Sequence, residues 1–163
     1  MICEPKGTSY AKDGKRLPFN KKWFSHKFKG AGVHYEISSC IRTGLIVHVN
    51  GPFPCGHFPD ITIFRKKLEG MLEVADEITI ADRGYRGTSR CRTPDDWLTL
   101  SERRANSNAR ARHETINGKL KTFRALSTKF RHNRSQHKEF FAVAVVTVQL
   151  MMEEYGTTFH VGY

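Results

Sequence analysis

Acidic residues are scarce in this chain of 163 residues. It contains 16 Asp and Glu against 27 Lys and Arg, which gives a formal net charge of +11 with the histidines neutral. A protein surface with such an excess of positive charge attracts polyanions and repels cationic partners. The composition therefore favours nucleic acid as the partner, ahead of an anionic membrane surface.

Cysteines and long apolar runs are scarce as well. The four cysteines lie far apart and form no Cys-x-x-Cys motif, so neither a zinc ribbon nor a small disulfide framework is indicated. The longest apolar run, Phe140 to Met152, is shorter than the ~18 residues that a membrane span needs. Residues 1–20 show no signal-peptide pattern. We therefore expect a protein of the cell interior that has no membrane partner.

A hairpin and a helix are predicted after a loose beginning. Residues 1–32 mix glycine and proline with many basic residues, which predicts an extended lead-in to a domain over residues 33–163. Residues 33–41 alternate in polarity and residues 45–49 are rich in branched side chains, which is typical of a strand hairpin. After a loop rich in proline and glycine, a helix is predicted to begin at Asp60, with a buried stripe of Ile61, Phe64, Leu68 and Met71.

Two strands and two long helices are predicted further along. The apolar run 78–81 predicts a buried strand ending at Asp82, and residues 91–93 a further strand. A helix from about Ser107 to Thr128 carries an apolar seam of Ile116, Leu120 and Phe123. The last helix, Lys138 to Tyr155, is so apolar that we expect the sheet to cover it. This order is typical of an α/β protein with a mixed sheet flanked by helices.

Three carboxylates occupy positions suited to metal-dependent phosphoryl transfer. Asp82 follows a predicted buried strand, Asp60 begins a helix after a tight loop, and Glu114 lies on a polar helix face near Arg110. Each also has a simpler interpretation. Asp60 can cap its helix, Glu114 can pair with Arg110, and Asp82 can form a turn. Spacing alone leaves both interpretations open.

Several motifs in order resemble those of the PIF/Harbinger-type DDE transposases and their domesticated nuclease-like relatives. The matching segments are residues 20–29, 51–60, 80–86, 111–117 and 130–132, and the similarity extends over nearly the whole chain. The resemblance implies an RNase H-like fold, a mixed sheet flanked by helices with acidic residues gathered around two divalent ions. It also implies a nuclear location in a eukaryote, or a cytoplasmic one otherwise, and a homo-oligomer or a separate DNA-binding partner protein.

The resemblance assigns roles to the three carboxylates. Asp82 matches the aspartate of the family's Ala-Asp-x-Gly-Tyr motif, Glu114 matches the glutamate of the following helix, and Asp60 matches an additional acidic position at a helix start. These residues are expected to bind Mg²⁺ or Mn²⁺, which prefer oxygen ligands, and Asp82 and Glu114 to be catalytic. The implied reaction is the cleavage of DNA phosphodiesters by two metal ions.

The front of the chain departs from the family's pattern. The family's first catalytic aspartate lies on the first strand, a few residues ahead of the match to Glu4-Pro5, and no acidic residue precedes Glu4 here. We therefore expect only a remnant of the first strand, an incomplete or degenerate catalytic triad, and weak or absent cleavage. The alternative is a domesticated, non-catalytic DNA- or protein-binding module with the same fold.

Basic residues next to aromatic ones predict contacts with DNA. The segment 21–29 interleaves lysines with Trp23, Phe24 and Phe28, and these rings can either stack on bases or pack onto the sheet. Further arginines flank Asp82 and Glu114. The expected DNA contacts are Lys21, Lys22, Lys27, Lys29, Arg83, Arg86, Arg110 and Arg112.

Overall fold

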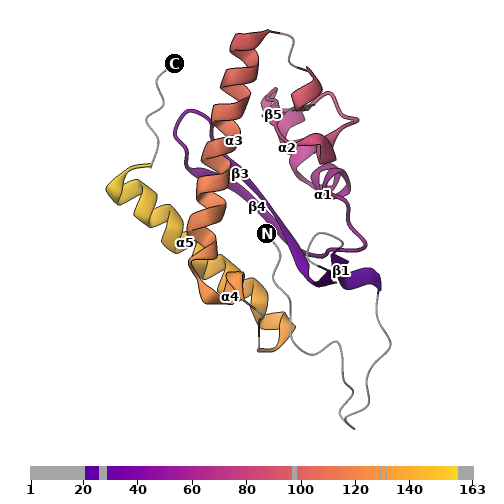
Figure 1. Cartoon of the computed structure of the whole chain (residues 1–163), viewed down its shortest axis with the longest axis vertical. Helices are drawn as coiled ribbons and strands as arrows, with labels where there is room; N and C mark the ends of the chain where they lie inside the picture. The colour runs from indigo at the N-terminus through magenta and orange to yellow at the C-terminus, as the bar shows by residue number, and fades with distance from the viewer. Residues whose placement is uncertain (1–20, 26–28, 97–98, 129, 131, 158–163) are drawn as a thin grey trace.

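The fold is built around an antiparallel hairpin (Figure 1). A computed structural model describes residues 21–25, 29–96, 99–128, 130 and 132–157. Strand β3 (Val33–Ser39) pairs with β4 (Ile46–Pro54), in a register that runs from Val33 opposite Pro54 to Ser39 opposite Ile46. The predicted hairpin is confirmed. Its second strand extends to Pro54, farther than the branched residues indicated.

The remaining described strands are short. Strand β1 (Phe24–Ser25) pairs antiparallel with β2 (Gly30–Ala31), next to the 3₁₀ turn η1 (Lys21–Trp23). Strand β5 (Thr79–Ile80) pairs in parallel with β6 (Cys91–Arg92). These strands and the hairpin form three separate two-stranded sheets within the described residues. The α/β class is confirmed, and the single RNase H-like sheet stays a prediction.

The helix predicted from Asp60 is broken in two. Helix α1 (Asp60–Lys66) ends at Lys67, whose backbone leaves the helical region, and α2 (Leu68–Ala75) follows directly. Phe64 and Leu68 are buried as predicted, whereas Met71 is 48% exposed. The prediction for Met71 is wrong because the break restarts the helix at a new angle, so that Leu72 is buried in its place.

The long polar helix begins earlier than predicted. Helix α3 (Leu100–Lys121) starts after Thr99, whose hydroxyl accepts a hydrogen bond from the Glu102 amide while the Glu102 carboxylate accepts one from the Thr99 amide. This reciprocal capping box satisfies two amides that lack helical partners, so the helix begins about seven residues before Ser107. It ends at Lys121, and the short helix α4 (Arg124–Ser127) follows.

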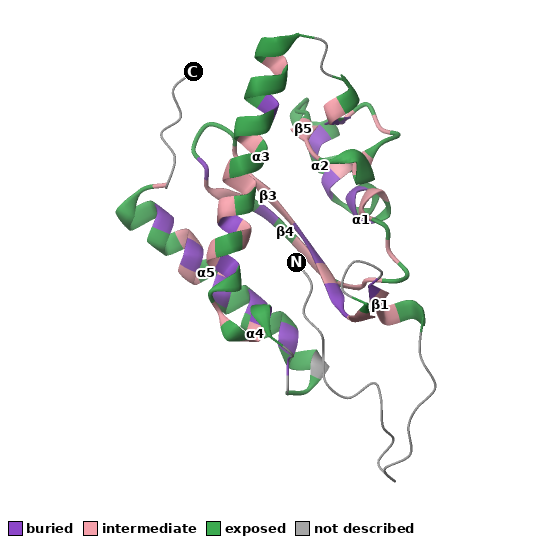
Figure 2. Ribbon diagram, in the orientation of Figure 1, coloured by how far each residue is buried: buried purple, intermediate pink, exposed green. Residues whose placement is uncertain are grey.

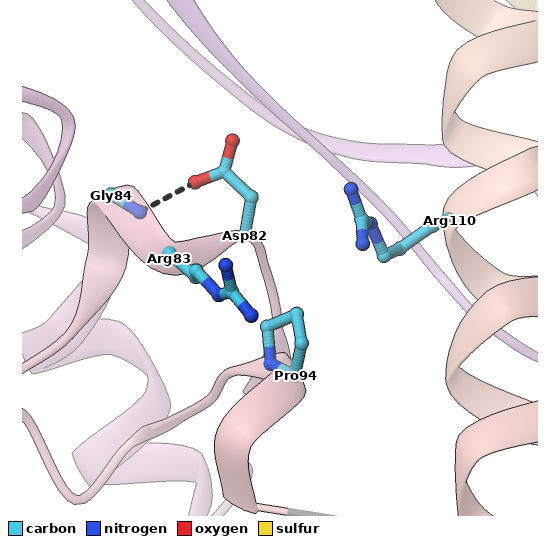
Figure 3. Close-up of a pocket in the computed structure, with 5 residues that line it drawn as sticks. All are labelled: Asp82, Arg83, Gly84, Pro94 and Arg110. Atoms are coloured by element: carbon cyan, nitrogen blue, oxygen red, sulfur yellow. Dashed lines mark hydrogen bonds between the residues drawn. The ribbon is translucent and has the colours of Figure 1, made fainter.

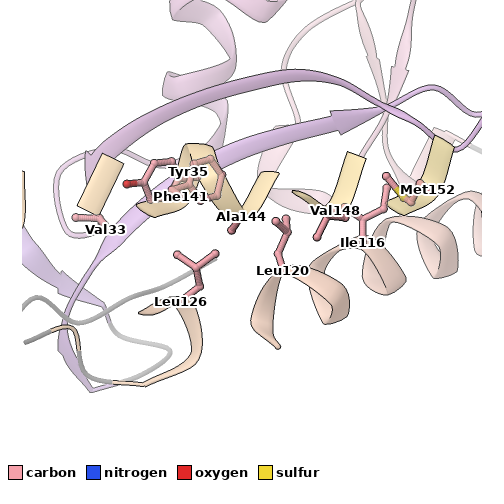
Figure 4. Packing of buried hydrophobic residues seen from close by; sticks show 9 residues of the cluster. All are labelled: Val33, Tyr35, Ile116, Leu120, Leu126, Phe141, Ala144, Val148 and Met152. Atoms are coloured by element: carbon pink, nitrogen blue, oxygen red, sulfur yellow. The ribbon is translucent and has the colours of Figure 1, made fainter. Parts of the chain in front are cut away.

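The main hydrophobic cluster lies between the hairpin and the C-terminal half of the chain (Figure 4). Helix α5 (His137–Tyr155), which follows the turn η4 (Arg134–Gln136), packs one face onto β3, α3 and α4. The predicted seam of α3 is confirmed for Ile116 and Leu120, which are buried, and Phe123 packs at the edge. The buried members are Val33, Tyr35, Ile116, Leu120, Leu126, Phe141, Ala144, Val148 and Met152.

Helix α5 is covered on one side only, which corrects the prediction that the sheet covers it (Figure 2). The two-stranded hairpin is too narrow to cover a helix that is apolar all round, so the opposite face remains exposed. Its large apolar residues Phe140, Val143, Val146, Leu150 and Met151 are 43% to 64% exposed. Within the described ranges, none of the helices combines the length and the apolar character needed to cross a bilayer.

A second, smaller cluster lies on the other side of α3. It joins Phe64, Leu68 and Leu72 of α1 and α2 to Cys91 of β6, with Tyr85 packed against it. Tyr85 belongs to the 3₁₀ turn η2 (Arg83–Tyr85), and another such turn, η3 (Pro94–Asp96), follows β6. Because α3 contacts both α5 and β5, it joins the two clusters.

Candidate functional site

Two of the three predicted carboxylates meet at Gly84. Asp82 lies just beyond β5 in an extended conformation, and its Oδ1 accepts a 2.8 Å hydrogen bond from the Gly84 amide. Asp60 is the first residue of α1 and makes no side-chain capping bond, since Pro59 occupies the cap position. A Cβ on Gly84 would lie 3.0 Å from Oδ2 of Asp60 and 3.0 Å from Oδ1 of Asp82. The two oxygens are therefore separated by no more than twice that distance.

The charge of the site is unbalanced around Asp60. Burial raises the pKa of the Asp60 carboxyl, and the neighbouring Asp82 adds to the rise. His34, on β3, opposes it, and its Nδ1 lies 3.9 Å from Oδ1 of Asp60. Burial lowers the pKa of His34 itself, which weakens this imidazole as a counter-ion. A cation placed beside Asp60 and Asp82 would relieve the repulsion between them.

Asp82 also opens onto a pocket of about 450 Å³ (Figure 3). The pocket is lined by Asp82, Arg83, Gly84, Pro94 and Arg110. Arg110 projects from α3 toward Asp82 across the pocket, which brings the long helix to the end of β5. A carboxylate on one wall and guanidinium groups on the others suit a ligand that combines a cation with a phosphate.

Glu114 is not among the residues that line this pocket. It lies one turn after Arg110 on the exposed side of α3. Among the described residues, no set of three or more histidine, cysteine and acidic side chains is close enough to hold a metal ion. The structure thus brings Asp60 and Asp82 together, and the role of Glu114 stays a prediction.

Arg112 and its neighbour His113 fasten α3 to the hairpin. The Arg112 guanidinium donates a 2.6 Å hydrogen bond to the Ile41 carbonyl, and Nε2 of His113 lies 3.0 Å from the Ile37 carbonyl oxygen. The sequence predicted that Arg112 contacts DNA and did not predict its hydrogen bond to the Ile41 carbonyl. A bond between residues so far apart in the sequence leaves no local pattern.

Two other predicted arginines share one acidic partner. Arg83 and Arg86 both form ion pairs with Asp95 of η3, at 3.3 Å for Arg83 and closer for Arg86. The side chains of both arginines are more than half exposed. Neither ion pair follows from sequence spacing.

The predicted lysines lie at the front of the described fold. Lys21 and Lys22 are exposed on η1, and Nζ of Lys22 lies 5.8 Å from the centre of the Trp23 ring. Lys29 is exposed and adopts a left-handed backbone with φ of 49°. Lys27 lies outside the described residues. These three lysines thus lie on the surface of the protein, where a polyanion can approach them.

The hairpin holds a buried polar pair that was not predicted from the sequence. Glu36 of β3 and His48 of β4 are both buried, and Nε2 of His48 lies 3.5 Å from Oε2 of Glu36. Neither Glu36 oxygen has a hydrogen-bond donor among the described residues. The charges of Asp60 and Glu36 add to burial in raising the pKa of Tyr85. The sequence signal for this pair was the polar residue at every second position of β3, where the residues between are apolar.

The comparison with protein families assigns the chain to one of them. The profile described as DDE superfamily endonuclease matches residues 12–149, which is well over half of the chain. The chain therefore belongs to the DDE superfamily endonuclease family. No curated protein and no solved structure matches it.

Proposed function

We propose that this chain is a transposase-type DDE endonuclease domain, of the PIF/Harbinger kind, that cleaves DNA phosphodiesters with the help of divalent metal ions. Family membership supports a nuclease of this superfamily acting on DNA. The observation that carries the proposal is the convergence of Asp60 and Asp82 on Gly84, at the edge of a pocket with Arg110 on its far wall. These two acidic residues come from separate elements, α1 and the end of β5.

The residues at Gly84 fit a divalent ion with oxygen ligands. Two carboxylate oxygens flank a space that a Cβ would fill, and glycine leaves that space open. Mg²⁺ is commonly held by one or two protein carboxylates, with substrate phosphate and water as the other ligands. When bound, such ions activate the attacking oxygen and stabilise the leaving oxygen of a phosphodiester. Asp60 and Asp82 would hold the metal in this chain.

Other residues would hold and orient the DNA. Arg110 faces Asp82 across the pocket, so its guanidinium can bind the phosphate that approaches the carboxylates. Glu114 lies on the same side of α3 one turn away, where it would act as the third carboxylate once DNA and metal are bound. Lys21, Lys22 and Lys29 would contact the phosphate backbone beyond the pocket.

We expect cleavage to be slow. Before DNA binds, only Asp60 and Asp82 converge among the described carboxylates, and two ligands hold metal ions less firmly than three. The alternative is a non-catalytic DNA- or protein-binding module with the same fold. Metal dependence separates the two functions, because a binding module has no need of a metal ion.

A nicking assay on supercoiled DNA with Mn²⁺ tests the proposal. Slow nicking is expected from the wild type, with a loss of about 100-fold or more in Asp82→Asn, the order of effect seen when a group that stabilises the transition state is removed. Asp76→Asn is the matched control, since Asp76 is exposed and pairs with Arg90 away from the pocket. Mn²⁺ is also expected to raise the melting temperature of the wild type but not of Asp82→Asn.

The outcomes separate the two functions. DNA binding without nicking and without stabilisation by Mn²⁺ would favour the binding module. Fast nicking that Asp82→Asn abolishes would support the endonuclease and contradict the expectation of slow cleavage. Nicking that persists in Asp82→Asn would exclude this site as its source.

A further inference from the structure

A single carboxylate holds two arginines at the rim of the pocket. Asp95 forms ion pairs with both Arg83 and Arg86, and Arg83 also lines the pocket next to Asp82. Pro94, the residue before Asp95, lies on the pocket wall as well. The turns η2 and η3 thus meet through one acidic and two basic side chains.

The geometry points to a binding site for phosphate. We propose that Arg83 and Arg86 form a phosphodiester-binding site that Asp95 occupies in the free protein and leaves when DNA binds. A carboxylate between two guanidinium groups has the arrangement that a phosphate group adopts with paired arginines. This inference rests on the proposed action on DNA. It adds that the Asp95 carboxylate competes with DNA phosphate for the two arginines and so lowers the affinity for DNA.

Exposure makes the exchange of partners feasible. The side chains of Arg83 and Arg86 are 70% and 57% exposed, and that of Asp95 is 40% exposed. Ion pairs this exposed are weak because water and salt screen them. A DNA backbone, with its dense row of phosphates, can therefore displace Asp95 from both arginines.

The neighbouring Asp96 forms local hydrogen bonds that stabilise the turn η3. Its Oδ2 accepts hydrogen bonds from the amide and the hydroxyl of Thr93, a buried residue, so it fixes the start of η3. These bonds lower the pKa of Asp96. Because Asp96 holds the turn in shape, Asp95 can be neutralised without loss of the local fold.

The charge balance predicts the effect of removing Asp95. With Asp95 ionised, the group of three side chains carries one net positive charge, and in Asp95→Asn it carries two. DNA binding is then expected to tighten about three- to tenfold, and the dependence of log Kd on log salt concentration to steepen by about one ion. Mutation of both arginines to alanine in the Asp95→Asn background is expected to cancel the gain.

The test measures binding of a short fluorescent DNA duplex across a series of salt concentrations, with EDTA present to prevent cleavage. Asp76→Asn is the matched control, because it also removes one negative charge from an ion pair with an arginine, at 2.9 Å, away from the pocket. Thermal melts check that all variants fold. Tighter binding and a steeper salt dependence in Asp95→Asn than in Asp76→Asn would support the inference.

Three other outcomes overturn it in distinguishable ways. Wild-type binding with no greater gain in Asp95→Asn than in Asp76→Asn would reject the competitor and leave the proposed function standing. A loss of affinity in Asp95→Asn would show that Asp95 orients the arginines for phosphate, which also rejects competition. Failure of the wild type and every variant to bind the duplex at low salt would overturn the proposed function and this inference together.

Discussion

The two sides of α3 differ in how they are packed. The side with β3, β4 and α5 holds the larger cluster, in which the rings of Tyr35 and Phe141 stack with centres 3.7 Å apart. The side with α1, α2 and β6 holds a smaller cluster, whose buried members among the described residues are Phe64, Leu68, Leu72 and Cys91. Asp60, Asp82 and Gly84 lie on the second side. The larger hydrophobic cluster thus lies on one side of α3, and the acidic residues of the candidate site lie on the other.

Substitutions in the two clusters are expected to differ in size. Phe141→Ala removes a stacked ring from the larger cluster, so it is expected to lower the free energy of unfolding by about 3–5 kcal/mol. Leu72→Ala lies in the small cluster and is 8% exposed, so the cavity can partly collapse and the loss is expected near the ~2 kcal/mol end of the range. Urea unfolding monitored by circular dichroism measures both. An equal decrease in the free energy of unfolding in the two variants would contradict the expected difference between the two clusters.

Gly84→Ala tests the charged side directly. The new Cβ would lie 3.0 Å from oxygens of both Asp60 and Asp82, so the carboxylates must separate, and affinity for Mn²⁺ is expected to fall about tenfold, or ~1.4 kcal/mol. Isothermal titration with Mn²⁺ gives the affinity.

The matched control for this substitution is Gly70→Ala. Gly70 lies on α2 with no atom near its Cβ position, so alanine there is expected to stabilise the helix by up to ~1 kcal/mol and to leave Mn²⁺ binding unchanged. Unchanged Mn²⁺ affinity in Gly84→Ala would mean that the metal does not bind between these carboxylates.

The smallest expected effect is a dependence on pH on the well-packed side. His137 is fully buried, shares a 2.7 Å hydrogen bond with the Tyr35 hydroxyl, and has its pKa lowered from 6.5 by burial. As the pH falls, His137 of the unfolded chain takes up a proton before His137 of the folded chain does. Protonation therefore stabilises the unfolded state relative to the folded state. The stability associated with a neutral His137 is therefore fully present above pH 6.5 and is lost as the pH falls toward the lowered pKa.

Thermal melts from about pH 7.5 to pH 5 measure this dependence. The decline is expected to be shallower in His137→Gln than in the wild type and unchanged in His57→Gln, since His57 is exposed. An identical decline in the wild type and His137→Gln would assign the pH dependence to other groups, of which His34 is one because its pKa is also lowered.

Local patterns predicted the elements but not their partners. The hairpin, the helix start at Asp60 and the seam of Ile116 and Leu120 follow from side-chain periodicity, which a single strand or helix carries in its own sequence. The start of α3 was predicted too late because the apolar seam begins well inside the helix. The signal at its true start was the pairing of Thr99 with Glu102.

The candidate site was predicted in part for the same reason. The sequence pointed to Asp60 and Asp82 individually, and the resemblance grouped them with Glu114. It gave no sign that Arg112 binds the Ile41 carbonyl or that Asp95 pairs with Arg83 and Arg86, because such contacts depend on how separate elements pack. The exposed face of α5 was missed because hydropathy does not reveal how much sheet is available to cover a helix.

The length of α3 links distant parts of the molecule. Arg110 reaches the pocket from the same helix that buries Leu120 in the larger cluster, and ten residues of helix separate them by about 15 Å. Arg110 lies two residues before Arg112, whose hydrogen bond to the Ile41 carbonyl holds this part of α3 on the hairpin. A shift of α3 caused by repacking around Leu120 is therefore expected to move the Arg110 guanidinium together with this contact. Substitutions in the hydrophobic interior are therefore expected to change any contact that Arg110 makes with a ligand in the pocket, although they lie far from it.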